Sequence, residues 1–115
     1  QHTVNYYISL KKSISLKLDL ISKSNIKRIV FYGAGEVMEV AFICLSGSDF
    51  ELTGIIDDSK DKQGEKLFGF TIMSSEYVHT LNAEAILVTS IRYRDRIMEN
   101  LRKNKSLDGV MIYSL

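Results

Sequence analysis

The sequence predicts an α/β fold, in which a doubly wound parallel sheet forms a single domain behind an N-terminal helical extension. Short apolar runs, which suit buried strands, alternate with segments whose apolar residues recur every three or four positions. A glycine turn directly follows the first of these runs. With 115 residues, 45% of them hydrophobic, the chain can bury one sizeable core but has no room for separate cofactor and catalytic domains.

The first 25 residues allow two interpretations. Residues 14–20 alternate strictly between apolar and polar side chains, which is typical of a half-buried strand. A helical stripe also runs through this segment, formed by Tyr7, Leu10, Ile14, Leu18 and Ile21. We favour the helix, because no turn residue interrupts the stripe. We therefore expect a helical extension over residues 1–25 and a Rossmann-like nucleotide-binding domain over residues 26–115.

The next segment predicts a strand, a turn and a helix in succession. Ile29 to Tyr32 form an uninterrupted apolar run, as expected for a central parallel strand that is buried on both faces. Gly33, Ala34 and Gly35 then form a turn. An apolar helical stripe follows and ends near Gly47; it consists of Val37, Met38, Val40, Ala41, Cys44 and Leu45.

The rest of the chain continues this alternation. Four further apolar runs predict strands: residues 50–56, 68–73, 85–89 and 110–113. Residues 57–66 are polar and predict a loop. A brief helix capped by Ser74 or Ser75 is expected to extend to Leu81. A longer one, capped by Ser90, is expected to carry Tyr93, Ile97, Met98 and Leu101 on one face.

The glycine turn between the first strand and its helix is the main candidate binding site. In a dinucleotide-binding fingerprint the first glycine makes the tight turn, and the second lets the backbone approach a pyrophosphate at the helix N-terminus. Met38 occupies the third glycine position, so either the helix lies farther from the sheet or the ligand is not a standard dinucleotide. The alternative is a bare turn that needs glycine for backbone reasons. The candidate ligand-binding residues here are Gly33, Ala34, Gly35, Glu36 and Val37.

Two acidic residues at the end of the second predicted strand strengthen this interpretation. Asp57 lies 22 residues after Gly35, where the acidic residue of a Rossmann unit accepts hydrogen bonds from a ribose hydroxyl. Asp58 adds a second negative charge, and together they would repel a 2′-phosphate. We therefore expect NAD, or another nucleotide with a free ribose, rather than NADP. Glu36 would also repel a phosphate unless its side chain turns away.

A third group of candidates follows the predicted strand 85–89. Ser90 can donate a hydrogen bond to a phosphate, Arg92 can pair with one, and Tyr93 can stack on a base. Thr89 belongs to the same loop. These residues have equally plausible structural roles, as a helix cap, a solvated charge and the edge of the core.

Other classes of function are disfavoured. The net charge of +1 argues against a dedicated nucleic-acid binder, and no apolar stretch is long enough to span a bilayer. Cys44 is expected to be a buried core thiol, and His79 has no partner at metal-ligand spacing, so no metal site is indicated. With one cysteine and no apparent secretory signal, we expect a cytoplasmic protein. We find no constellation of acid, base or nucleophile.

Four segments together resemble a known family: residues 27–36 (KRIVFYGAGE), 54–58 (GIIDD), 64–70 (GEKLFGF) and 93–97 (YRDRI). They are similar to the Rossmann-type, CoA-binding-like domain at the N-terminus of bacterial polysaccharide-biosynthesis nucleotide-sugar dehydratases and dehydrogenases. A similar module occurs in bacterial sugar acyltransferases. The resemblance covers residues 26–115. It implies that the glycine turn, matching Gly33 and Gly35, and the acidic pair, Asp57 and Asp58, line a site for NAD or a UDP-linked sugar.

The chain departs from that family at Met38, and it lacks the membrane helices and catalytic domain often joined to this module. Two hypotheses remain. The first is a nucleotide or nucleotide-sugar binding module of cell-surface polysaccharide biosynthesis, which is part of or partner to an enzyme that modifies nucleotide sugars. The second is a non-catalytic assembly or regulatory domain that has lost its ligand. In either case we expect a homodimer, since two-fold dimers dominate among oligomers.

Overall fold

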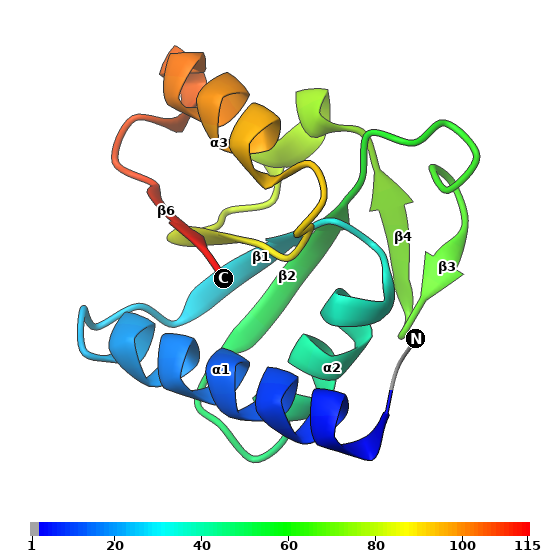
Figure 1. Ribbon diagram of the computed structural model, residues 1–115. Helices are drawn as coiled ribbons and strands as arrows, with labels where there is room; N and C mark the ends of the chain where they lie inside the picture. The colour runs from blue at the N-terminus through cyan, green and yellow to red at the C-terminus, as the bar shows by residue number, and fades with distance from the viewer. Residues whose placement is uncertain (1–2) are drawn as a thin grey trace.

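The computed structural model describes residues 3–115 as a sheet between two layers of helices (Figure 1). The helices are α1 (Val4–Ser22), α2 (Glu36–Leu45) and α3 (Arg94–Lys103), with short 3-10 helices η1 (Ser75–Thr80) and η2 (Lys105–Leu107). The strands are β1 (Arg28–Tyr32), β2 (Glu51–Ile56), β3 (Lys66–Leu67), β4 (Phe70–Met73), β5 (Ala85–Val88) and β6 (Met111–Ser114).

The six strands form one sheet in the order β3-β4-β2-β1-β5-β6. Every neighbouring pair is parallel except β3 and β4, which are antiparallel. The predicted α/β fold with a doubly wound, mostly parallel sheet is therefore confirmed, with β1 in the interior of the sheet. Its residues from Ile29 to Tyr32 are all buried, which explains why they are apolar on both faces.

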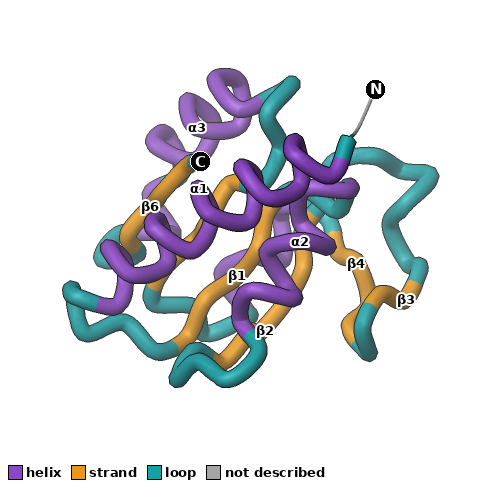
Figure 2. The backbone as a smooth tube through the Cα atoms, turned by 60° about the horizontal axis from the view of Figure 1, so that its bottom comes forward, coloured by secondary structure: helices purple, strands orange, loops and turns teal. Residues whose placement is uncertain are grey.

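Each face of the sheet has its own core. Figure 2 shows α1 and α2 together on one face. That core includes Ile29 and Phe31 from β1. The other core lies on the face of η1 and α3 and includes Val30 and Tyr32. Alternate residues of β1 thus supply opposite cores, as the two-residue period of a strand requires.

The N-terminal segment is the favoured helix and not a strand. Thr3 caps α1 by accepting a hydrogen bond of 3.2 Å from the Tyr6 N–H through its hydroxyl oxygen. Four members of the predicted stripe are buried in the core, namely Leu10, Ile14, Leu18 and Ile21. The fifth member, Tyr7, is 36% exposed within this chain. Residues 1 and 2 of the predicted 1–25 extension lie outside the described residues.

The predicted strand over residues 68–73 is instead part of a hairpin. Phe68 and Gly69 form its turn, with φ values of 52° and 84°. Two positive φ values in succession match the twist of a two-residue hairpin. The Phe68 ring stacks on Phe42 of α2 with the ring centroids 4.0 Å apart. The apolar side chain that suggests a strand at this position therefore anchors a turn.

The predicted cap of α3 is also wrong. The helix begins at Arg94, and Ser90 lies in the preceding turn, where its hydroxyl accepts a hydrogen bond from the Tyr93 N–H. Tyr93 is 44% exposed and does not belong to the buried face, whereas Ile97 and Leu101 do. The segment before the helix is therefore a turn at the carboxyl edge of the sheet.

None of the helices within residues 3–115 combines the length and the apolar character that crossing a membrane requires.

Candidate functional site

The candidate residues gather at the carboxyl ends of β1, β2 and β5, where the glycine turn meets two loops. The Gly33 N–H donates to the carbonyl of Ile56 at 2.8 Å, and the Thr89 N–H donates to the carbonyl of Tyr32 at 2.9 Å. Three segments that are distant in the sequence are thereby fixed side by side. Open α/β sheets bind their ligands at this edge, where strand order reverses on either side of a central strand.

The two glycines of the turn have different structural needs. Gly33 has φ of +121°, and a Cβ atom there would lie 2.8 Å from the backbone nitrogen of Ser90. Glycine is therefore required at this position by the backbone alone. Gly35 is the N-cap of α2 with an ordinary φ of −115°, and a Cβ atom added there would meet nothing within 4 Å among residues 3–115. The described part of the chain does not require Gly35, so the open space beside it is available to a ligand.

Asp57 ties the end of β2 to this turn. One carboxylate oxygen accepts a hydrogen bond of 2.7 Å from the Ala34 N–H, and the other accepts one of 2.8 Å from the Ser59 N–H. The side chain is only 15% exposed. A carboxylate offers about four acceptor positions, so its remaining lone pairs can accept from a ribose hydroxyl. The structure thus shows a role for Asp57 inside the chain that the sequence spacing does not reveal.

Asp58 is exposed and accepts hydrogen bonds of 2.7 and 2.8 Å from the hydroxyl of Tyr32. Tyr32 is the last residue of β1 and is 3% exposed. Burial raises the pKa of its phenol well above the ordinary value, and the neighbouring Asp58 carboxylate raises it further. The phenol therefore stays protonated and acts as a donor. In the sequence pattern Tyr32 stands out only as a strand residue of the core.

The loop after β5 divides into buried and accessible parts. Thr89 is 2% exposed, and its hydroxyl donates toward the carbonyl oxygens of Gly33 and Tyr32, at 2.7 and 3.1 Å. That hydroxyl is already used to hold the glycine turn. Ser90 and Tyr93 are less buried. Arg92 lies over the Tyr93 ring, 5.2 Å from its centroid.

Two cavities meet at this edge. A cavity of about 630 Å³ lies on the α1 and α2 side and is lined by Gly35, Glu36, Val37 and Arg92, among others. A smaller cavity of about 240 Å³ lies toward α3 and is lined by Tyr32 and Asp58, among others. Both are lined by the same five residues, namely Gly33, Asp57, Ser59, Ser90 and Tyr93. The two cavities therefore adjoin at these five residues, at the centre of the carboxyl edge of the sheet.

Two basic residues at the site are absent from the sequence-based candidates. Lys62 reaches from the loop after β2, and its ammonium donates to the Ala34 carbonyl at 3.1 Å and lies 4.0 Å from Asp57. Arg96 of α3 lines the smaller cavity and lies over the Tyr93 ring, 4.9 Å from its centroid. Lys62 lies in a polar loop without a recognisable motif, whereas Arg96 belongs to the family-like segment 93–97 but is not singled out there by its sequence position.

Met38 and Glu36, the two residues that depart from a standard dinucleotide fingerprint, lie in different surroundings. Met38 is fully buried and belongs to the core shared by α1, α2 and the sheet. It therefore packs on the inner side of α2 and lines neither cavity at the glycine turn. Glu36 is exposed at the start of α2 and accepts a hydrogen bond from the hydroxyl of Tyr7. Glu36 lines the larger cavity, and its carboxylate bonds to α1.

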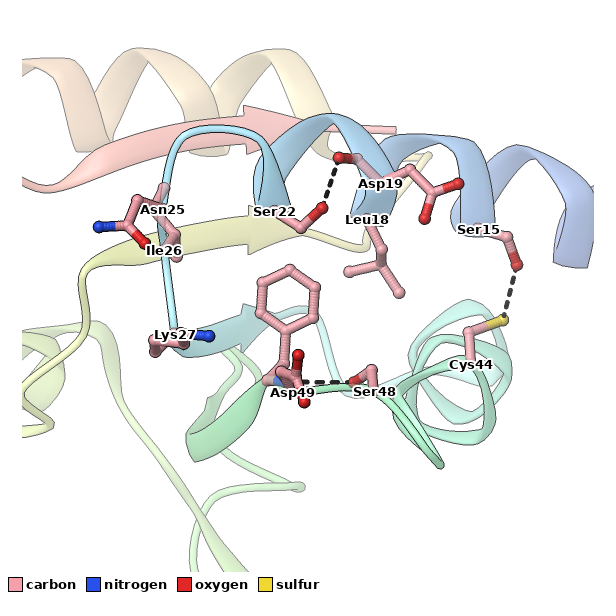
Figure 3. Close-up of a pocket in the computed structure, with 11 residues that line it drawn as sticks. Ser15, Leu18, Asp19, Ser22, Asn25, Ile26, Lys27, Cys44, Ser48 and Asp49 are labelled. Atoms are coloured by element: carbon pink, nitrogen blue, oxygen red, sulfur yellow. Dashed lines mark hydrogen bonds between the residues drawn. The ribbon is translucent and has the colours of Figure 1, made fainter.

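A separate cavity of about 470 Å³ lies at the opposite edge, between α1 and the amino ends of β1 and β2 (Figure 3). None of the predicted ligand-binding residues lines it. Cys44 does, and it is half-buried rather than fully buried as expected, with Sγ 3.8 Å from the Ser15 hydroxyl. Residues 3–115 contain no group of three or more potential metal ligands. His79 is exposed on η1.

Comparisons with known proteins support the fold. Residues 25–113 match the family described as C2185-like, N-terminal. UDP-D-quinovosamine 4-dehydrogenase from Vibrio fischeri has a similar structure, with a TM-score of 0.61, 21% identity and coverage of 78% of each chain. No curated protein matches the sequence.

Two further solved structures are similar. RSP, a Rex-family repressor that has also been crystallised with β-NADH, gives a TM-score of 0.56 at 16% identity over 78% of this chain. A chorismate mutase/shikimate 5-dehydrogenase fusion protein from Clostridium acetobutylicum gives 0.53 at 13% identity over 91% of this chain. The matches cover 53% and 48% of those proteins, so this chain spans about half their length. At these identities the likeness shows the Rossmann-type fold.

Proposed function

This chain belongs to the C2185-like, N-terminal family, and we propose that it is a nucleotide-binding module whose ligand is NAD or a UDP-linked sugar. The observation that carries the proposal is the open space at Gly35. This glycine caps α2 beside a cavity of about 630 Å³, and no contact within residues 3–115 explains the absence of a side chain there. A close approach of a ligand to the backbone does explain it.

The diphosphate of such a ligand would lie at the N-terminus of α2. The first N–H groups of a helix have no partner within the helix, and together with the helix dipole they favour an anion. Lys62 and Arg92 both line the same cavity and supply positive charge. These features match the distribution of negative charge in a nucleoside diphosphate.

The nucleoside would lie against the residues that line both cavities. Asp57 retains acceptor positions for a ribose hydroxyl, while Asp58 and Tyr32 line the smaller cavity. The exposed Tyr93 ring offers a stacking surface for a base. The proposed site residues are therefore Gly33, Ala34, Gly35, Glu36, Val37, Asp57, Asp58, Thr89, Ser90, Arg92 and Tyr93, to which we add Tyr32, Lys62 and Arg96. Thr89 contributes by holding the turn.

We place this module in cell-surface polysaccharide biosynthesis in the cytoplasm. The sequence resemblance to nucleotide-sugar dehydratases and the structural likeness to a UDP-D-quinovosamine dehydrogenase support this context. The chain would serve as part of, or partner to, an enzyme that modifies a nucleotide sugar. We expect no turnover by the chain alone, because the acidic and basic groups at the centre of the two cavities, Asp57, Asp58, Tyr32 and Lys62, hydrogen-bond to one another or to the backbone and not to a nucleophile.

One observation favours a second candidate, a scaffold that has lost its ligand and acts in assembly or regulation. The carboxylate of Asp57 accepts the hydrogen bond of the Ala34 N–H. This N–H is one of the turn amides that would otherwise donate to a phosphate. In this case the N–H groups of the turn would find their acceptors within the chain, and the turn would need no nucleotide.

Thermal shift and calorimetry with NAD, NADP, a UDP-sugar and coenzyme A test the proposal. A ligand at about 100 times its dissociation constant adds about 2.7 kcal/mol of stability, which is readily measured. Stabilisation by NAD or the UDP-sugar, lost in Gly35→Val, would support the module. Gly35→Ala serves as a graded control, since a Cβ atom at this position meets no obstacle among the described residues. No stabilisation by any of the four would favour the assembly domain.

A further inference from the structure

We infer that Tyr7 of α1 is a positioning residue for the nucleotide site, because its hydroxyl holds the Glu36 carboxylate and keeps that charge from opposing a phosphate at the start of α2. The inference rests on the proposed function and assigns α1 a part in it. The family match begins at residue 25, so α1 lies outside the matched segment.

The contact joins two helices at the cavity. Tyr7 lies near the beginning of α1, and Glu36 is the first residue of α2, 29 positions later in the chain. The adjacent Tyr6 lines the same cavity of about 630 Å³ as Gly35 and Glu36. The beginning of α1 therefore forms one wall of the proposed site, and the Tyr7 hydroxyl bonds to a group on the neighbouring wall.

Electrostatics give this contact its significance. A carboxylate at the first position of a helix is attracted by the same N–H groups and dipole that would bind a diphosphate. A Glu36 carboxylate turned toward the start of α2 would compete with the ligand for those groups and would repel its phosphates. A hydrogen bond from a phenol satisfies the carboxylate and fixes its position. Tyr7 thus makes an acidic residue compatible with an anion site.

The contact can be observed without any ligand. The Glu36 carboxylate, through this hydrogen bond, raises the pKa of the Tyr7 phenol above its ordinary value. Titration of the Tyr7 ring carbon by ¹³C NMR should therefore show a lower pKa in Glu36→Gln than in the wild type. Equal values in the two proteins would show that the contact is absent in solution and would overturn the inference.

Its role is tested by the affinity for NADH and for UDP-N-acetylglucosamine, measured by calorimetry. Tyr7→Phe should weaken the binding of whichever probe the wild type takes by about threefold or more, the scale of a charge at a helix terminus. Tyr7→Phe combined with Glu36→Gln should restore it, because no carboxylate then stands at the start of α2. Tyr77→Phe is the matched control, since this exposed tyrosine lies on η1 and lines neither cavity of the site, so it should leave affinity unchanged.

The outcomes separate the two proposals. If the wild type binds a probe and Tyr7→Phe binds it equally well, the positioning role is wrong and the nucleotide site stands. If Tyr7→Phe weakens binding and Glu36→Gln does not restore it, the tyrosine acts through packing and the inference is again wrong. If neither the wild type nor Glu36→Gln binds either probe, the proposed function fails, and the positioning role fails with it.

Discussion

The Asp57 carboxylate accepts a hydrogen bond of 2.7 Å from the backbone N–H of Ala34, so the end of β2 is joined directly to the glycine turn after β1. Lys62 reinforces this junction, because its ammonium donates to the Ala34 carbonyl. The same three residues thus shape the turn and border the proposed ligand site. A substitution at this point of the fold is therefore expected to change both the stability and the proposed ligand binding.

We expect Asp57→Ala to lower the free energy of unfolding by about 1 to 3 kcal/mol, since the Ala34 and Ser59 N–H groups lose a charged acceptor. It should also weaken a ribose-containing ligand by about tenfold or more. Urea denaturation and calorimetry measure the two effects. Asp61→Ala, at an exposed position in the same loop, should change stability by less than about 0.5 kcal/mol. Unchanged ligand affinity in Asp57→Ala would contradict the ribose assignment.

The two glycines of the turn should respond in opposite ways. Gly33→Ala places a Cβ 2.8 Å from the Ser90 backbone at a positive φ, so we expect a loss of more than about 1 kcal/mol in unfolding free energy. Gly35→Ala should leave stability within about 0.5 kcal/mol and reduce ligand affinity. Denaturation of both variants, followed by circular dichroism, checks the contrast. Equal stability losses would show that Gly35 is also a structural requirement.

The raised pKa of the Tyr32 phenol predicts that the protein loses stability in alkali. This pKa is raised in the folded protein, mainly by burial, so above about pH 10 the unfolded chain releases the phenolic proton more readily than the folded one. The stabilisation is complete below about pH 10 and decreases as the pH rises toward the folded pKa. Urea denaturation from about pH 8 to about pH 11 should show a steeper decrease for the wild type than for Tyr32→Phe. Parallel curves would refute a perturbed Tyr32.

The predicted homodimer needs an exposed surface other than the stripe of α1 that is buried in the core. The stripe from Leu10 to Ile21 packs inside the chain, while α1 exposes a second set of apolar residues, Val4, Ile8, Leu16 and Leu20. If the chain dimerises through this set, Leu16→Glu should dissociate the dimer without unfolding the domain. Light scattering measures the mass of both proteins. A wild-type monomer at high concentration would contradict the dimer.

Local pattern predicts the centre of this fold well. The run from Ile29 to Tyr32, the glycine turn and the α2 stripe follow one another in the sequence and need no distant contact to be recognised. The hairpin at Phe68 is missed for a physical reason: the residue is apolar, as in a strand, but packs across the chain on Phe42. Its position in a turn is linked to that tertiary contact.

The candidate site is predictable only in part. Spacing places Asp57 at the right strand end, but its bond to Ala34 depends on how the two loops meet. Tyr32 resembles an ordinary strand residue, although its hydroxyl reaches Asp58, 26 positions later. Lys62 comes from a polar loop whose path no local pattern specifies. Contacts of this kind arise from the topology of the sheet and not from neighbouring residues.

The two-residue strand β3 also affects how molecules of this protein meet one another. It forms one border of the sheet, where unpaired backbone groups can recruit a strand from another chain. A border of two residues, one of them the charged Lys66, offers too short a template for such pairing. The hairpin that replaces the predicted single strand thus protects this border of the sheet, opposite β6, against edge-to-edge aggregation.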